Sequence, residues 1–306
     1  MTDRTNVVSP WGKLAILMLL AVVSAAALSI PSRADAARNG PILFSDYTNI
    51  WKIQPDGSKL KKLARRAAWS LDASPNGKTL AYTHDGLFTM PIKGGRPTNL
   101  LRRYPIVARF AGINWASWAP NGRRIVFSGQ NDGRIYVIKA NGKGLAYLFG
   151  KNRTGLLHPV WSPTGREIAY IDVRKGSSLM AVNVKSGKTR LIYPGDGPAG
   201  TPVDFDWHPS GDRIAFYAPP RGGMIDRDGS DLRQISPDAA FVSYENLDFS
   251  PDGTSLLGRS VASGGTTSEI WELDGTFGAA SGGFVNEVTG TFDGSAFFPE
   301  WAPKAR

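Results

Sequence analysis

A short pattern recurs along the chain: an aromatic residue, a small residue, Pro, a polar residue and Gly, followed by alternating apolar residues. The copies read DASPNGKTLAYT (72–83), SWAPNGRRIVFS (117–128), VWSPTGREIAYI (160–171), DWHPSGDRIAFY (206–217), DFSPDGTSLLGR (248–259) and a truncated EWAPKAR (300–306). Their prolines, at positions 75, 120, 163, 209, 251 and 303, lie 42 to 52 residues apart. That period is in the range of four-stranded propeller blades, so the repeat constrains the whole fold.

Each copy predicts a tight turn between two strands. Pro163 presets its own φ and Gly165 occupies the last position of a type I turn, after which Ile168 and Tyr170 alternate with smaller or polar residues. A third strand and a Gly-containing hairpin turn follow, as in RIYVIKANG (134–142). The fourth strand carries Lys and Arg, as in KTRLI (188–192), which is typical of an exposed sheet edge.

The two ends of the chain contain complementary parts of one blade. Residues 39–63 lack the strand that precedes the Pro-Gly turn elsewhere, and residues 297–306 contain only that strand. We therefore expect residues 37–306 to form an all-β, six-bladed β-propeller of four-stranded antiparallel blades. The ring would be closed by pairing the C-terminal strand with the N-terminal strands in one blade.

The motifs WSPTGREIAY, APNGRRIVF and SPDGTSLL resemble the WD-like repeats of the TolB-type six-bladed β-propeller family, over essentially all of residues 39–306. The resemblance implies a non-catalytic protein–protein interaction module in the cell envelope or extracellular space. TolB carries an α/β domain ahead of its propeller, and we expect this chain to lack it. The expected partner is an envelope or extracellular protein, and the expected state is a monomer.

The N-terminus has the pattern of an export signal. Basic residues precede the apolar run LAILMLLAVVSAAALSI (14–30), and Ala34 and Ala36 form a small-residue cleavage site. We expect residues 1–36 to be a signal peptide and the mature protein to be periplasmic or secreted. An uncleaved membrane anchor is the alternative. The chain has no cysteine, so its stability must come from packing alone.

Motifs for catalysis are missing from the sequence. There is no GxSxG nucleophile elbow, and the two Gly-Lys-Thr stretches lack the earlier Gly of a phosphate-binding loop. The only histidines, His84, His158 and His208, occupy different repeat positions, so no metal site is predicted. The turn with Asp226, Asp228 and Asp231 departs from EF-hand spacing, which favours a hairpin turn over a site for calcium or another divalent metal. We expect no cofactor and no enzymatic activity.

Acidic residues gather at one repeat position. In the first strand of each blade, the residue before the aromatic position is Asp72, Ser117, Val160, Asp206, Asp248 or Glu300. His158 lies two residues before Val160, and Asp204 lies two residues before Asp206. First strands line a propeller's channel, so we predict a binding site at one channel mouth, formed by Asp72, His158, Asp204, Asp206, Asp248 and Glu300. Four acids at one position of a chain with net charge +10 indicate a site for a cation, such as a partner's Lys, Arg or N-terminus, or a metal ion.

Two other interpretations of this acidic position stay open. The carboxylates could serve only as acceptors for backbone N–H groups of the adjacent blade. Alternatively, the channel could belong to a metal-assisted lyase or hydrolase acting on a carbohydrate or lactone.

Basic residues suggest a second surface, consisting of Lys59, Lys61, Lys62, Arg65, Arg66, Arg102 and Arg103. These side chains could protect an edge strand, or dock the protein on anionic envelope polymers. A structural or surface-coating role based on positive charge is a further alternative. Nucleic acid is not an expected partner of an exported protein.

Overall fold

The protein is described by a computed structural model that covers residues 39–46, 48–150, 152–219, 221–235, 245–261, 268–274, 284–287 and 296–304. All of these residues belong to the unit formed by residues 37–306. The predicted signal peptide lies outside the described residues. Within the described part of the chain, no helix is long and apolar enough to cross a membrane.

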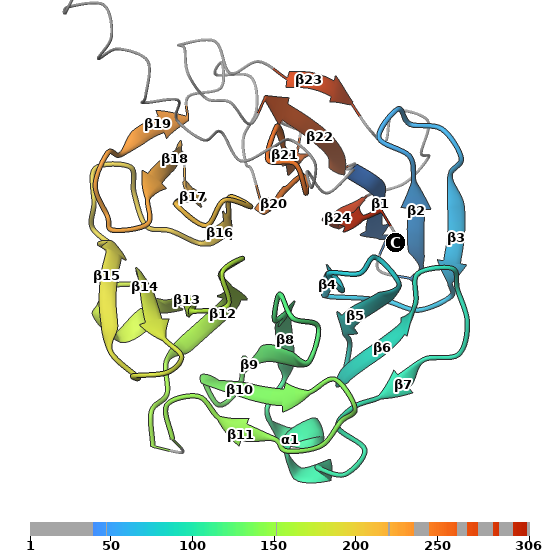
Figure 1. Ribbon diagram of the computed structural model, residues 1–306, viewed down its shortest axis with the longest axis horizontal. Coiled ribbons are helices and arrows are strands. Elements are labelled where there is room, and N and C mark those ends of the chain that lie inside the picture. Colours follow the sequence, from blue (N-terminus) through green and yellow to red (C-terminus); the bar gives the residue numbers. More distant parts are fainter. Residues whose placement is uncertain are drawn as a thin grey trace, which may run out of the picture. The chain divides into compact units, whose positions relative to one another are not determined.

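The described residues form six four-stranded antiparallel sheets, arranged as the blades of a β-propeller around a central axis (Figure 1). Five blades are continuous in sequence, and in each of them the first strand is the innermost. They are β4(Ser70–Ala73), β5(Thr79–Thr83), β6(Leu87–Pro91) and β7(Thr98–Asn99); β8(Ile113–Trp118), β9(Arg124–Gly129), β10(Arg134–Lys139) and β11(Ala146–Tyr147); β12(Leu156–Trp161), β13(Glu167–Asp172), β14(Ser178–Asn183) and β15(Thr189–Tyr193); β16(Asp204–Trp207), β17(Arg213–Ala218), β18(Arg221–Asp226) and β19(Arg233–Ile235); and β20(Glu245–Phe249), β21(Ser255–Val261), β22(Ser268–Asp274) and β23(Phe284–Glu287).

The sixth blade joins the two ends of the described chain. Its innermost strand is β24(Phe297–Pro303), followed outward by β1(Asn39–Ser45), β2(Ile50–Ile53) and β3(Lys61–Ala64). Strand β24 runs antiparallel to β1, with Trp301 opposite Ile42 and Glu300 opposite Leu43. The predicted closure of the ring by one shared blade is therefore confirmed, and it leaves no unpaired inner strand.

The repeated turn forms as its residue types predict. In the third intact blade, the N–H of Gly165 donates to the carbonyl of Ser162 at 2.8 Å, and Gly165 has φ of 68°, which glycine adopts without strain. The hydroxyl of Ser162 accepts the N–H of Glu167 at 3.1 Å, which ties the turn to the next strand. Ile168 and Tyr170 are then fully buried, as the alternation of apolar residues requires.

The aromatic position of the repeat builds the core between blades. Trp118, Trp161, Trp207, Phe249 and Trp301 are all buried, whereas the first copy has the small residue Ala73. Trp207 lies in one cluster with residues of the preceding blade, including Ile171 and Ala181. Burial of such a ring stabilises the fold by about 2–3 kcal/mol, so these residues act as scaffold.

One described connection between blades contains an α-helix, α1(Pro105–Phe110), inserted between β7 and β8. Because neighbouring strands are antiparallel, the outermost strand of a blade ends on the face of the ring at which the innermost strands begin. Helix α1 and the other connections between blades therefore lie on that face. The 3-10 turn η2(Val173–Lys175) joins β13 to β14 on the same face.

Candidate functional site

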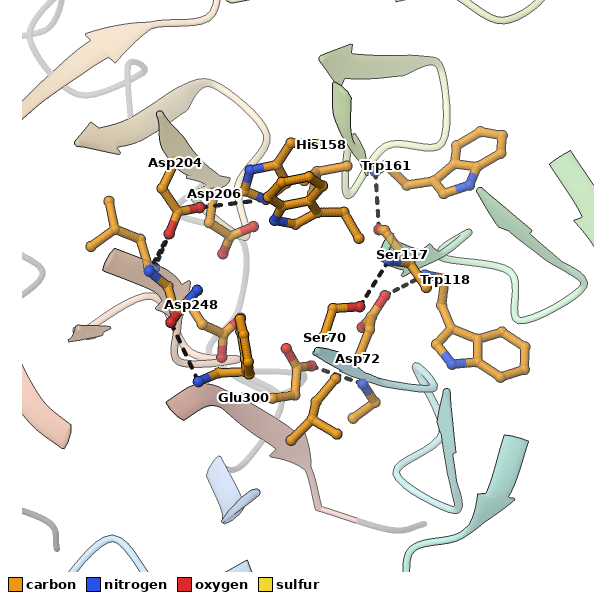
Figure 2. Close-up of a pocket in the computed structure, with 18 of the residues that line it drawn as sticks. Ser70, Asp72, Ser117, Trp118, His158, Trp161, Asp204, Asp206, Asp248 and Glu300 are labelled. Carbon is orange, nitrogen blue, oxygen red and sulfur yellow. Dashed lines mark hydrogen bonds and ion pairs between the residues drawn. The ribbon is translucent and has the colours of Figure 1, made fainter. Parts of the chain in front are cut away.

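A cavity of about 210 Å³ lies on the axis and is lined along the length of the six innermost strands. Figure 2 shows that its lining side chains come from β4, β8, β12, β16, β20 and β24. All six residues predicted for the channel mouth line this one cavity: Asp72, His158, Asp204, Asp206, Asp248 and Glu300. No Lys or Arg belongs to its described lining.

Residues at the position before the aromatic form what we call the carboxylate ring: Asp72, Ser117, Val160, Asp206, Asp248 and Glu300. Each polar member accepts a backbone N–H from the innermost strand of the next blade. The Asp206 carboxylate accepts from Phe249 at 2.9 Å, and Glu300 accepts from Ala73 at 2.9 Å. The remaining donors are Trp118 to Asp72, Trp161 to Ser117 and Trp301 to Asp248.

This chain of hydrogen bonds has the pattern expected if the carboxylates join neighbouring blades. Val160 cannot accept, so the series is broken between β12 and β16. The ring carboxylates are nevertheless only half-buried, because they also face the cavity. A structural role and a recognition role are therefore compatible in the same side chains.

Three residues earlier than the aromatic, the same strands supply a second set, which we call the entrance ring: Ser70, Trp115, His158, Asp204, Asn246 and Phe298. Four of its members have positive φ, with 40° at Trp115, 50° at His158, 61° at Asn246 and 54° at Phe298. Each of the four coincides with a register shift between the innermost strand and its neighbour. Such left-handed backbone in non-glycine residues costs on the order of 1–3 kcal/mol each and concentrates at binding sites.

His158 is held tightly within the entrance ring. Its imidazole stacks on Trp115, with ring centroids 5.1 Å apart, and contacts Phe205 at 4.8 Å. Nε2 lies 3.4 Å from Oδ1 of Asp204, whose other oxygen accepts the N–H groups of Asn246 and Leu247. Burial lowers the pKa of His158 to about 3, although the carbonyl of Val203 opposes this effect. The imidazole is therefore neutral at physiological pH.

The carboxylates have the opposite electrostatic character. Burial raises the pKa of Asp72 to about 8, and the pKa values of Asp204 and Asp206 to about 7, against the N–H donors that favour ionisation. Burial also raises the pKa values of Asp248 and Glu300 well above their usual range, and neighbouring ring carboxylates add to the effect. The ring therefore carries protons near neutral pH, and a bound cation would displace them.

No protein-family model matches the sequence, and no curated protein matches it either. Among solved structures, TolB from Acinetobacter baumannii superposes with a TM-score of 0.67 at 15% identity, over 87% of this chain and 67% of that one. A protein of Agrobacterium tumefaciens described as TolB superposes with a TM-score of 0.62 at 18% identity, over 87% of this chain and 99% of that one.

The fold is that of a TolB-like β-propeller. A chain of a nidogen/laminin complex is similar as well, with a TM-score of 0.69 at 12% identity, over 86% of this chain and 98% of that one. The predicted resemblance is thus confirmed for the fold. At these identities the comparisons give the architecture of the TolB-like propeller, and its function must be argued from the site.

The other candidate ligand groups do not converge in this TolB-like propeller. In the described part of the chain, no three His, Asp or Glu side chains are placed to hold a metal ion. The turn after β18 is a hairpin turn: Asp228 accepts the N–H and hydroxyl of Ser230, and Asp231 pairs with Arg233. His208 instead packs its ring edge-on against Phe249, 5.1 Å away.

The seven residues of the predicted basic surface are all exposed, but the fold divides them. Arg65, Arg66, Arg102 and Arg103 lie in connections between blades, on the face of the channel mouth. Lys59 lies in a hairpin at the opposite face, while Lys61 and Lys62 lie on the outermost strand β3. Lys62 stacks its ammonium over Trp51 at 4.9 Å from the ring centroid.

Proposed function

We propose that this protein is an exported, non-catalytic binding module that receives a cationic group of a protein partner in the channel mouth. The group would be a Lys or Arg side chain or an N-terminal amine. One observation carries the proposal: four carboxylates of the carboxylate ring and Asp204 meet in one cavity without a Lys or Arg in its described lining, in a chain of net charge +10.

The cavity supplies two kinds of contact for a cation. The ring carboxylates are partly removed from water, which strengthens their attraction for an opposite charge. Trp115 and Phe298 add aromatic side chains at the entrance, where a cation–π contact is worth about 0.5–2 kcal/mol. His158 is neutral and does not repel the incoming charge.

The binding geometry would be preorganised. The hydrogen bonds to the next blade fix Asp72, Asp206, Asp248 and Glu300, so little side-chain freedom is lost on binding. Four residues of the entrance ring have left-handed backbone conformations, which non-glycine residues disfavour. A strand with a purely structural role would not need this strain. The export signal pattern of residues 1–36 and the TolB-like fold support a partner in the cell envelope or extracellular space.

Capture of a partner from an envelope extract tests the proposal. The tagged mature protein would be compared with Asp206→Asn/Asp248→Asn, and with the control Asp56→Asn/Asp228→Asn, which removes two exposed carboxylates from hairpins on the other face. We expect the wild type and the control to capture the same protein and the ring variant to lose it. Equal capture by a folded ring variant would contradict the proposal. Elemental analysis that finds a stoichiometric divalent metal would favour the metal-assisted enzyme instead.

A further inference from the structure

Helix α1 presents two apolar side chains to solvent. Ile106 is 74% exposed and Phe110 is 63% exposed, the highest values among the large apolar side chains of the described residues. Their spacing of four residues places both on the same side of the helix. Adjacent exposed apolar side chains of this kind are found where a protein contacts a partner or a membrane.

The exposed side chains stand on a rigid base. Leu100, Leu101, Ala111 and Ile113 on either side of the helix are buried in the core of the blade, and Val107 packs against the same cluster. The hydroxyl of Tyr104 accepts the N–H of Leu145 at 3.2 Å. This hydrogen bond joins the segment before the helix to the hairpin between β10 and β11. The protein therefore holds Ile106 and Phe110 outward by packing on the opposite side of the helix.

Positive charge surrounds the two apolar residues. Arg102, Arg103 and Arg109 are exposed, and the guanidinium of Arg109 lies 5.2 Å from the ring centroid of Phe110. The helix has no acidic residue in its first turn. Between Asp85 and Asp132 the sequence has no Asp or Glu. Of the seven basic residues in this stretch, Arg102, Arg103 and Arg109 lie on the face of α1, whereas Lys93, Arg96, Arg123 and Arg124 lie at turns on the opposite face. Asp85 lines a pocket beside Ala108 and Arg109, so one acidic residue borders the helix.

We propose that this α1 platform, formed by Ile106, Phe110, Arg102, Arg103 and Arg109, docks the protein reversibly on an anionic lipid bilayer. The arginines would bind lipid phosphates while Ile106 and Phe110 enter the boundary between headgroups and acyl chains. An anionic polymer matches the charge but offers no apolar phase for these two side chains, which is why the platform favours lipid. Docking would place the face with the channel mouth toward the membrane, since α1 lies on that face.

Cosedimentation with vesicles tests the contribution of each part of the platform. The mature protein would be mixed with vesicles of phosphatidylcholine alone or with added phosphatidylglycerol. We expect binding only with phosphatidylglycerol, and a loss of about tenfold or more in Ile106→Ser/Phe110→Ser and in Arg102→Ser/Arg103→Ser. The matched controls are Leu191→Ser/Leu232→Ser and Lys185→Ser/Lys188→Ser, which change exposed residues remote from α1 in sequence. Failure to bind anionic vesicles, or equal losses in the controls, would overturn the proposal.

Insertion can be measured directly because the chain has no cysteine. An environment-sensitive fluorophore on Ile106→Cys should shift to shorter wavelength with phosphatidylglycerol vesicles, whereas the same label on Leu191→Cys should not. Binding without a shift at position 106 would indicate a purely electrostatic attachment and would contradict insertion. A concentration-dependent dimer that Ile106→Ser/Phe110→Ser abolishes would assign the platform to a second copy of the chain instead.

Discussion

Asp206 on β16 accepts the backbone N–H of Phe249 on β20 at 2.9 Å, while the same carboxylate lines the cavity at the axis. One side chain thus joins two blades and faces the site. Burial raises its pKa to about 7, so the folded protein favours the protonated carboxyl more than the unfolded chain does. Stability and recognition can therefore be separated by experiment. An Asn side chain at position 206 has the same shape and can still accept the N–H of Phe249, but it carries no charge with which to bind a cation.

Asp206→Asn should change how stability depends on pH. The folded pKa of Asp206, about 7, lies above its unfolded value, so the wild type loses stability as pH rises from about 4 through about 7. Asn has no such loss. In thermal unfolding, the melting temperature of the variant relative to the wild type should therefore rise between pH 5 and pH 8. Each kcal/mol of relative stability corresponds to about 2–4 °C in melting temperature. A difference that is constant across this range would contradict the assigned pKa.

Glu167→Gln should destabilise the protein at neutral pH, where the Glu167 carboxylate is ionised. The buried carboxylate of Glu167 lies 2.9 Å from Nη2 of Arg190 in its own blade and 2.7 Å from Nε of Arg227 in the next. Burial opposes ionisation, but these two hydrogen-bonded arginines lower the pKa of Glu167 to about 2.

The stabilisation from Glu167 is complete above about pH 4.5 and is lost as pH falls through about 2. Near pH 7 we expect the Gln variant to be less stable by about 1–3 kcal/mol, since both arginines are partly exposed. Denaturant unfolding at pH 7 and acid titration measure this. The variant should lack the wild-type loss of stability at low pH, and identical acid profiles would refute the assignment.

Trp161→Ala and Trp115→Ala should distinguish a tryptophan that stabilises the fold from one that binds the partner. Trp161 is 7% exposed in the core between blades, so its removal should cost about 3–5 kcal/mol. Trp115 is half-buried at the cavity and stacks on His158, so its removal should cost less than half as much but weaken partner capture strongly. Denaturant unfolding and capture yield together provide the measurement. The reverse order of stability losses would show that the entrance ring is structural.

His158 should remain neutral across the physiological range. Its folded pKa of about 3 lies below the unfolded value of about 6.5, so this group lowers stability as pH falls from 6.5 toward 3. In an NMR titration, the imidazole nitrogens assigned to His158 by loss in His158→Asn should keep the chemical shifts of a neutral ring between pH 5 and pH 8, with only a small change as the neighbouring Asp204 ionises near pH 7. A full change to the shifts of a protonated ring as pH falls to 5 would mean that the imidazole is accessible to water.

The sequence predicted the architecture because the turn chemistry is local and repeated. Pro163 and Gly165 specify a turn from four residues, and six copies in register specify a ring. The carboxylate ring was also predictable, since the position before the aromatic faces the axis in every blade. The prediction of a recognition role for Asp72, His158, Asp204, Asp206, Asp248 and Glu300 remains to be tested.

The residues Trp115 and Phe298 and the helix α1 were not predicted from the sequence. Trp115 and Phe298 belong to the same repeat column as His158 and Asp204, three residues before the aromatic, so an alignment of that column contains the signal. The backbone conformation of Trp115 and Phe298 could not be predicted, because each lies at a β-bulge. A bulge adds one residue to a strand and so breaks the regular alternation of apolar and polar residues on which the prediction depends. Helix α1 spans only six residues, which is too short for a helical period to stand out.

If the carboxylate ring binds a cation, then binding should release protons from the ring near neutral pH. Titration calorimetry of the captured partner at pH 7, in two buffers of different ionisation enthalpy, counts the protons exchanged. Because the ring carries protons that a bound cation displaces, we expect net proton release by the wild type. The variant Asp206→Asn/Asp248→Asn should lose this release and bind more weakly. Unchanged affinity with no proton exchange would contradict the claim.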